Sequence, residues 1–264
     1  MKTLKIAKII IGLGLATTVA PTFAAEAVVT SATPETITTG NRYGNPTLYL
    51  SDISSAKAWL NVSKKKDENG KKPVIIDVRR VEEFVAGHPV GALSIPFPHV
   101  TGSPAKANDS ENGYIGYDVS VDSEVGFLAT DGKDGTLPIE DFVAHVERFV
   151  KDKNQPIYLL CKTGHRSVQA ANALVKYGNY TQVKNIWEGY EGQPKYAYTG
   201  AVPTVTSTGD LANPYKFVQL DLNHDGVFDN NDKDGWAFYQ GLPTETKLNK
   251  KSVFDPSLYN VVKK

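Results

Sequence analysis

Short apolar runs alternate along the chain with stretches in which apolar residues recur every three or four positions. The continuous run at 74–78 is typical of a strand that is buried on both faces of a parallel sheet. After Ile139, a helical face is formed by Phe142, Val146 and Phe149. The pattern predicts strands at 47–50, 74–78, 92–95, 156–161 and 183–187, and helices at 54–62, 81–86, 139–150 and 168–177. Because strands alternate with helices, we expect an α/β fold with a parallel sheet and helices on both faces.

Two long stretches, at about 100–136 and 192–233, interrupt this alternation. Connections in compact domains are usually much shorter, and long ones tend to be functional or to carry structure of their own. We therefore expect both stretches to be insertions in the α/β domain.

The N-terminal segment has the pattern of a secretory signal peptide. Three lysines in the first eight residues precede an apolar stretch at 9–19, which is too short to span a bilayer. We expect residues 1–24 to be removed on export to the periplasm or the cell exterior, with a membrane anchor as the alternative. The Thr-, Ala- and Val-rich residues 25–46 read as a tether, and no later segment is apolar enough to span a membrane.

Charge and cysteine content limit the possible partners. Removing residues 1–24 removes three lysines and no acid, which leaves 26 basic and 29 acidic residues and a net charge of about −3. This balance gives no case for binding nucleic acid or an anionic membrane. Cys161 is the only cysteine, so it cannot form an internal disulfide, and it is either buried filler or a working group.

Cys161 ends the predicted strand at 156–161 and opens the loop CKTGHRS, which leads into a helix. Gly164 allows the backbone of this loop to turn inward without a Cβ clash. A thiol in this position lies among backbone N–H groups and near the positive end of a helix, which favours the thiolate. The position of the single thiol therefore suggests a nucleophile at the end of a central strand.

Several motifs together resemble the rhodanese family. They are residues 74–79 with their continuation through Glu83-Phe84, Gly87-His88 and Gly91-Ala92, the Cys161 loop, residues 185–189, and Gly235-Trp236 followed by Gly241-Leu242-Pro243. The last motif is similar to the closing element of many rhodaneses, which implies that the domain is interrupted and resumes at Gly235. The resemblance thus implies a rhodanese fold at 47–245 with the two insertions, followed by a C-terminal tail at 246–264.

The resemblance also implies sulfur transfer at Cys161. The thiolate would take a sulfur atom from a donor and hold it as a persulfide, with Lys162 and Arg166 suiting an anionic donor such as thiosulfate. The loop residues Thr163, Gly164, His165 and Ser167 would surround the extra sulfur, and Asp77 and Arg79 resemble a supporting ion pair. From Cys161 to Arg166 the loop has six residues. The related cell-cycle phosphatases have a loop one residue longer, so the length favours sulfur over phosphate.

The second insertion contains a twelve-residue stretch, at 221–232, that fits the calcium loop of an EF-hand. Gly226 stands at the sharp turn, and Phe228 holds the apolar position that anchors such loops. The predicted oxygen ligands are Asp221, Asn223, Asp225, the Val227 carbonyl, Asp229 and Asp232. We expect a structural Ca²⁺ ion of modest affinity, because position 12 is Asp rather than Glu, and no organic cofactor.

The sequence therefore predicts an exported sulfurtransferase that moves sulfane sulfur from a small anionic donor, through Cys161, to a thiophilic acceptor or an acceptor protein. Two alternatives keep the fold but not the turnover. One is a persulfide carrier or binding module, and the other is a calcium-dependent interaction protein that uses the fold as a scaffold.

Overall fold

The computed structural model describes residues 47–101, 116–117, 136–198 and 217–261. The predicted signal peptide, the tether and most of the first insertion lie outside these residues. Within the described part of the chain, no helix is both long enough and apolar enough to cross a membrane.

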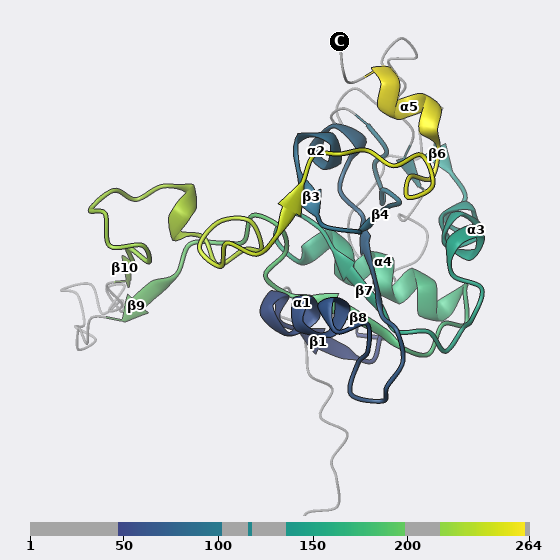
Figure 1. Ribbon diagram of the computed structural model, residues 1–264, viewed down its shortest axis with the longest axis horizontal. Coiled ribbons are helices and arrows are strands. Elements are labelled where there is room, and N and C mark those ends of the chain that lie inside the picture. The colour runs from purple at the N-terminus through teal and green to yellow at the C-terminus, as the bar shows by residue number, and fades with distance from the viewer. Residues whose placement is uncertain (1–46, 102–115, 118–135, 199–216, 262–264) are drawn as a thin grey trace, which may run out of the picture. The chain divides into compact units, whose positions relative to one another are not determined.

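A five-stranded sheet forms the centre of the fold, and all its paired strands are parallel (Figure 1). The strand order is β1 (Ser51–Ile53), β8 (Val183–Ile186), β7 (Ile157–Leu160), β2 (Val74–Asp77) and β4 (Leu93–Ser94). Asp77 pairs in register with Leu160. Because both strands end at this pair, the residues that follow β2 and the Cys161 loop that follows β7 leave the sheet at the same edge.

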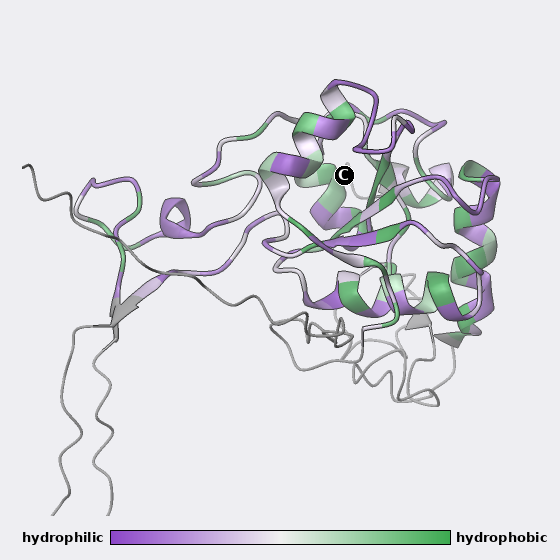
Figure 2. Ribbon diagram, turned by 90° about the horizontal axis from the view of Figure 1, so that it is seen from below, coloured by the Kyte–Doolittle hydropathy of each residue, from purple (hydrophilic) through white to green (hydrophobic). Residues whose placement is uncertain are grey.

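Helices cover both faces of the sheet, as the two views in Figure 1 and Figure 2 show. The helix α1 (Ser55–Ser63) lies on one face, and α4 (His165–Lys176) lies on the other, packed against β7 and β8 with α3 (Ile139–Phe149) beside it. The short α2 (Val81–Ala86) follows β2 and ends at Gly87. All four residues of β7 are buried, as expected for a central strand with helices on both sides. The predicted α/β fold with a parallel sheet is therefore confirmed.

Two predicted elements differ from the structure by three residues or more at an end. The strand expected at 47–50 begins at Ser51, because pairing starts where the Leu50 N–H donates to the Val183 carbonyl at 2.9 Å. Leu50 is 54% exposed, so its apolar side chain does not mark a buried strand position. The helix expected from 168 begins at His165, because its first turn is polar and apolar periodicity cannot detect a polar turn.

The chain returns to the sheet domain after the second insertion. The Trp236 side chain is fully buried, meets Trp59 of α1 edge-on at 6.1 Å between ring centroids, and donates from Nε1 to the Pro243 carbonyl at 3.0 Å. Gly235 lies against Glu191 and Gly192 with no room for a Cβ atom. The Gly-Trp element is thus part of the core.

Part of the segment at 246–264, predicted as a C-terminal tail, packs against the sheet domain. Val253 forms a parallel bridge to Ser94, and the Phe254 N–H donates to the Ser94 carbonyl at 3.0 Å. Helix α5 (Pro256–Val261) follows, and the Tyr259 hydroxyl donates to Ser94 Oγ at 2.6 Å. Val253, Phe254 and Tyr259 are buried, so this segment extends the core beyond β4.

Within the described residues, three strand pairs lie outside the main sheet. They are β3 (His88–Pro89) with β11 (Thr244–Glu245), β5 (Gly116–Tyr117) with β6 (Thr136–Leu137), and β9 (Tyr196–Tyr198) with β10 (Phe217–Gln219). The β9–β10 pair belongs to the second insertion. It precedes the loop at 221–232, called the acidic loop below, which ends in a 3₁₀ turn at Asn230–Asp232.

Candidate active site at Cys161

The Cys161 thiol lies directly after β7 and is 1% exposed. The Gly164 N–H donates to its Sγ at 3.1 Å, and the Ser167 hydroxyl donates to it at 3.3 Å. Gly164 has φ +91°, in the left-handed region that suits glycine, and it caps the N-terminus of α4. The loop therefore directs two hydrogen-bond donors and a helix N-terminus at the sulfur, which are features that stabilise a thiolate.

The segment from Gly189 to Gly192 supports the Cys161 loop through backbone hydrogen bonds. The Tyr190 N–H donates to the Cys161 carbonyl at 2.7 Å, and the Glu191 N–H donates to the Lys162 carbonyl at 2.9 Å. This segment is held in turn by the returning chain, because the Trp236 N–H donates to the Gly189 carbonyl at 3.0 Å. The Gly235-Trp236 element therefore supports the Cys161 loop indirectly, through residues 189–192.

A pocket of about 390 Å³ opens beside the loop. The loop supplies Lys162, Thr163, His165 and Arg166 to its lining, while Arg80, Glu83 and His99 come from the segments that follow β2 and β4. These segments meet because the parallel strands end at the same edge of the sheet. Burial, followed by the charge of Arg166, lowers the pKa of His165, which favours the neutral imidazole at neutral pH.

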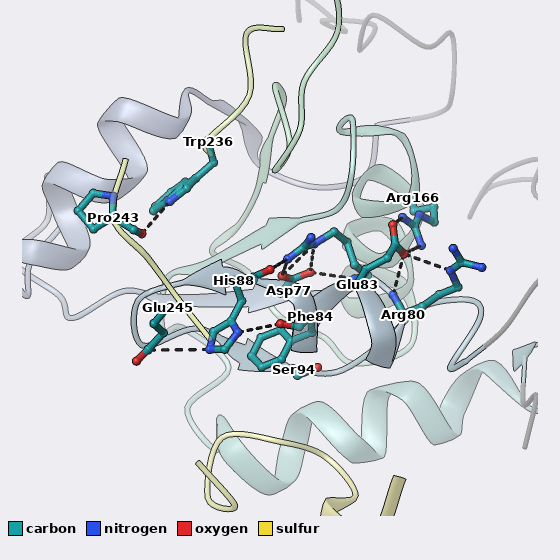
Figure 3. Close-up of polar contacts among 12 residues, drawn as sticks. Asp77, Arg80, Glu83, Phe84, His88, Ser94, Arg166, Trp236, Pro243 and Glu245 are labelled. Atoms are coloured by element: carbon teal, nitrogen blue, oxygen red, sulfur yellow. Dashed lines mark hydrogen bonds and ion pairs between the residues drawn. The ribbon is translucent and has the colours of Figure 1, made fainter. Parts of the chain in front are cut away.

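Glu83 brings a negative charge to this pocket and pairs with two arginines (Figure 3). Its two carboxylate oxygens accept from Nη1 and Nη2 of Arg166, both at 3.1 Å. One oxygen also accepts from the Arg80 backbone N–H at 3.1 Å and from Arg80 Nε at 3.2 Å. Burial acts to raise the pKa of Glu83, but the charge and hydrogen bonds of Arg166 outweigh it and hold the pKa at about 2. Glu83 is therefore ionised at neutral pH.

Lys162 shares its acidic partner with a residue at the end of the second insertion. Its Nζ lies 3.3 Å from Glu191 Oε2, and Lys233 Nζ lies 3.9 Å from the same oxygen. Nearly half of the Lys162 side chain remains exposed. This lysine therefore retains access to solvent, whereas Arg166 is largely enclosed.

Asp77 and Arg79 form a buried ion pair, with 2.6 Å between Arg79 Nη2 and Asp77 Oδ2. Arg79 also donates to the Gly87 carbonyl at 2.6 Å and stacks over the Tyr190 ring, with Cζ 3.7 Å from its centroid. Since the Tyr190 N–H donates to the Cys161 carbonyl, these contacts allow the Asp77–Arg79 pair to support the loop through Tyr190.

The structure places every predicted loop residue at one site: Lys162, Thr163, His165 and Arg166 line the pocket, and Gly164 and Ser167 contact the sulfur. Arg80, Glu83 and His99 also line the pocket, although none of them was predicted as a site residue. A usable signal existed for Arg80 and Glu83, because they follow a strand that neighbours β7.

The acidic loop closes through its own carboxylates. Both oxygens of Asp221 accept backbone N–H groups, from Asp225 at 3.2 Å and from Gly226 at 2.7 Å. The buried Asp232 accepts from the Leu222 N–H at 2.6 Å and from the Asp229 N–H at 3.0 Å. The first and last predicted ligands therefore reach across the loop.

In this loop, the exposure of Phe228 differs from the prediction, whereas the backbone at Gly226 agrees with it. Phe228, expected to anchor the loop, is 58% exposed, because no other element of the described chain covers it. Gly226 has φ +81°, in agreement with a sharp turn there. In the part of the chain that the structure describes, no group of three or more His, Cys, Asp or Glu side chains is arranged so that it could hold a metal ion. The Ca²⁺ site therefore stays a prediction.

Comparison with known proteins identifies the family. The chain matches the rhodanese-like domain over residues 61–193, just over half of its 264 residues. No curated protein matches it. Similar solved structures include the crystal structure of Rv0390 from M. tuberculosis, with 18% identity, a TM-score of 0.38, and coverage of 75% of this chain and 99% of that one. Another is the solution structure of the rhodanese-like domain of the Alr3790 protein from Anabaena sp, with 17% identity, a TM-score of 0.31, and coverage of 52% of this chain and 68% of that one. The family match covers the central strands and the Cys161 loop, and the chain belongs to the rhodanese-like domain family.

Proposed function

We propose that the protein is a sulfurtransferase that carries sulfane sulfur on Cys161. The Cys161 thiolate attacks the outer sulfur of a small anionic donor, the sulfur–sulfur bond of the donor breaks, and the remainder leaves with the electron pair. With thiosulfate, the leaving group is sulfite. A thiophilic acceptor then attacks the outer sulfur of the persulfide and regenerates the thiolate. Each step conserves sulfur and charge without a further oxidant or reductant.

The two hydrogen bonds to Cys161 Sγ carry this proposal. Donors from Gly164 and Ser167 stabilise negative charge on the sulfur, both as the attacking thiolate and as the leaving group of the second step. A persulfide extends the side chain by one sulfur–sulfur bond of about 2 Å. The adjoining pocket, lined by Lys162 and Arg166, offers space and positive charge for the donor.

Transfer of sulfur from thiosulfate to cyanide tests this function. We expect thiocyanate formation by the wild-type protein and none by Cys161→Ser. Ser167→Ala, which removes one hydrogen-bond donor and keeps the thiol, is expected to reduce the rate roughly 100-fold, at the lower end of the range for a lost donor in an anion-stabilising site. Equal rates for the wild type and Cys161→Ser would reject the proposal.

A second candidate is a persulfide carrier that exchanges sulfur with a partner protein. Because Cys161 is 1% exposed, such an exchange would require the loop to move and expose the thiol. A carrier would acquire about 32 Da, the mass of one sulfur atom, on Cys161 and would show no turnover with small acceptors.

We further propose that the loop at 221–232 binds Ca²⁺ and that the protein is exported. The carboxylates of Asp221, Asp225, Asp229 and Asp232 are the hard oxygen donors that Ca²⁺ requires, and Asn223 and the Val227 carbonyl add neutral oxygens. The Asp232 carboxylate accepts from the Leu222 N–H, so the two ends of the stretch lie close together. When bound, the ion would hold the insertion in one conformation through these residues. Calorimetric titration with Ca²⁺ tests the site, and cell fractionation tests export.

A further inference from the structure

Glu83 occupies the place where an anionic donor would be expected to meet Arg166. A guanidinium recognises an anion best through two parallel hydrogen bonds. In this pocket, Glu83 already takes the paired Nη1 and Nη2 groups of Arg166, each at 3.1 Å (Figure 3). A donor must therefore bind Arg166 through its remaining surface or compete with the carboxylate.

Glu83 also reduces the positive charge of the pocket. Among the described residues, the lining includes three cations, Arg80, Lys162 and Arg166, and one carboxylate, that of Glu83. Glu83 holds two of these cations at once, because it also accepts from Arg80 Nε at 3.2 Å. An anion next to either arginine therefore lies close to a fixed negative charge.

The repulsion grows with the charge on the donor. Its energy is proportional to the product of the two charges, so a dianion is repelled about twice as strongly as a monoanion of the same size and position. The side chains of Glu83 and Arg166 are only 15% and 16% exposed, so solvent screens this repulsion incompletely. Glu83 remains ionised at neutral pH because Arg166 stabilises its charge.

We propose that Glu83 sets the charge specificity of the donor pocket, because it weakens the binding of dianions such as thiosulfate more than the binding of monoanionic sulfane donors, such as organic persulfides. This inference rests on the proposed sulfurtransferase function. The pocket volume of about 390 Å³ agrees with it, because this space is larger than thiosulfate needs and leaves room for an organic body.

Glu83→Gln is the variant that isolates the charge. Glutamine keeps the length of the side chain and one acceptor oxygen for the Arg80 N–H or for Arg166. Glu82→Gln is the matched control, because it removes the same charge one residue earlier. The Glu82 carboxylate lies 3.5 Å from Arg80 Nε and lines a different pocket, on the side of Tyr190 and Phe238.

Binding is measured by calorimetry in a Cys161→Ser background, where sulfur transfer cannot occur. The probes are thiosulfate, a dianion, and methanethiosulfonate, a monoanion in which a methyl group replaces one oxygen. We expect Glu83→Gln to tighten thiosulfate binding roughly ten-fold and methanethiosulfonate binding roughly three-fold. Glu82→Gln is expected to change both by less than about two-fold.

A second measurement needs no change at Glu83. In the Cys161→Ser protein alone, the additional charge of thiosulfate is expected to improve its binding over that of methanethiosulfonate by less than about ten-fold, because Glu83 offsets part of the attraction. This comparison remains available if Glu83→Gln does not fold.

Three results would overturn the inference: unchanged or weaker thiosulfate binding in Glu83→Gln, an equal gain for both anions, or the same gain in Glu82→Gln. Thiosulfate binding that is undetectable both with Glu83 in place and in the Glu83→Gln variant also counts against it, because a released Arg166 should bind the dianion. Failure of the proposed function would appear separately, as the absence of added sulfur on Cys161 in the wild-type protein.

Discussion

Gly189 lies against the backbone of Lys162, with φ +75° and no room for a side chain. A Cβ atom at this position would come within 2.7 Å of the Lys162 carbonyl carbon and oxygen. A glycine that is distant in sequence therefore helps to position the Cys161 loop through close contact with the backbone of Lys162. The proposed chemistry depends on this support, because the Gly164 and Ser167 donors reach the sulfur only when the loop keeps its path.

Gly189→Ala is expected to impair both stability and sulfur transfer. The left-handed backbone alone costs about 1–2 kcal/mol for a residue with a side chain, and the clash with Lys162 adds to this cost. Gly70→Ala is the matched control, since Gly70 has φ +78° and open space around its Cα. Urea unfolding and the thiosulfate–cyanide rate measure the two effects. Loss of activity in both variants, or in neither, would contradict a specific role for Gly189.

Trp236→Ala should destabilise the fold by about 3–5 kcal/mol, the range for truncating a buried aromatic side chain. Trp236 is fully buried and packs against Trp59, and its backbone holds Gly189. Tyr239→Ala serves as a control, because Tyr239 is 53% exposed, and its expected cost is below about 0.5 kcal/mol. Denaturant unfolding measures both. A small cost for Trp236→Ala would show that the domain does not need the returning segment.

Much of this architecture could be predicted from the pattern of apolar residues. The runs at β2 and β7 indicated central parallel strands, and the periodicity after Ile139 indicated α3. The glycine within the loop and the thiol at the strand end located the candidate site. These features are local, so a single sequence displays them directly.

The contacts between distant segments could not be predicted in the same way. The pair of Glu83 with Arg166 depends on the register of β2 against β7, which apolar periodicity does not specify. The burial of Phe254 and Tyr259 depends on an edge of the sheet that remains open beside β4. Short polar-flanked segments such as 253–259 carry too few apolar residues to reveal that they complete a core.

The Glu83–Arg166 pair predicts a specific loss of stability in acid. The pKa of Glu83 falls from 4.5 in the unfolded chain to about 2 in the folded protein. Its stabilising contribution is therefore complete above about pH 4.5 and is lost as the pH falls from 4.5 to 2, with an upper bound of about 3 kcal/mol. The stability difference between the wild type and Glu83→Gln should shrink over this range in urea unfolding. A difference that is constant from pH 6 to pH 2 would contradict the assignment.

Ca²⁺ is expected to raise the melting temperature through the loop at 221–232. At a concentration about 100 times the dissociation constant, a bound ion adds about 2.7 kcal/mol of stability, which corresponds to roughly 5–10 °C for a domain of this size. Asp221→Asn should reduce this shift, whereas Asp152→Asn, in an exposed turn where Asp152 accepts from the Asn154 N–H, should not. Differential scanning in Ca²⁺ and in EGTA measures the shift. Identical melting in both would exclude a structural ion.

The most direct test of the account is the mass of the protein after exposure to a sulfur donor. Wild-type protein is incubated with thiosulfate and, separately, with cysteine persulfide, and Cys161→Ser is treated in parallel. Sulfur transfer through Cys161 predicts a gain of about 32 Da on the peptide that contains this residue, its removal by cyanide, and no gain in Cys161→Ser. Wild-type protein that gains no mass from either donor, or thiocyanate formation that persists in Cys161→Ser, would contradict sulfur transfer through this thiol.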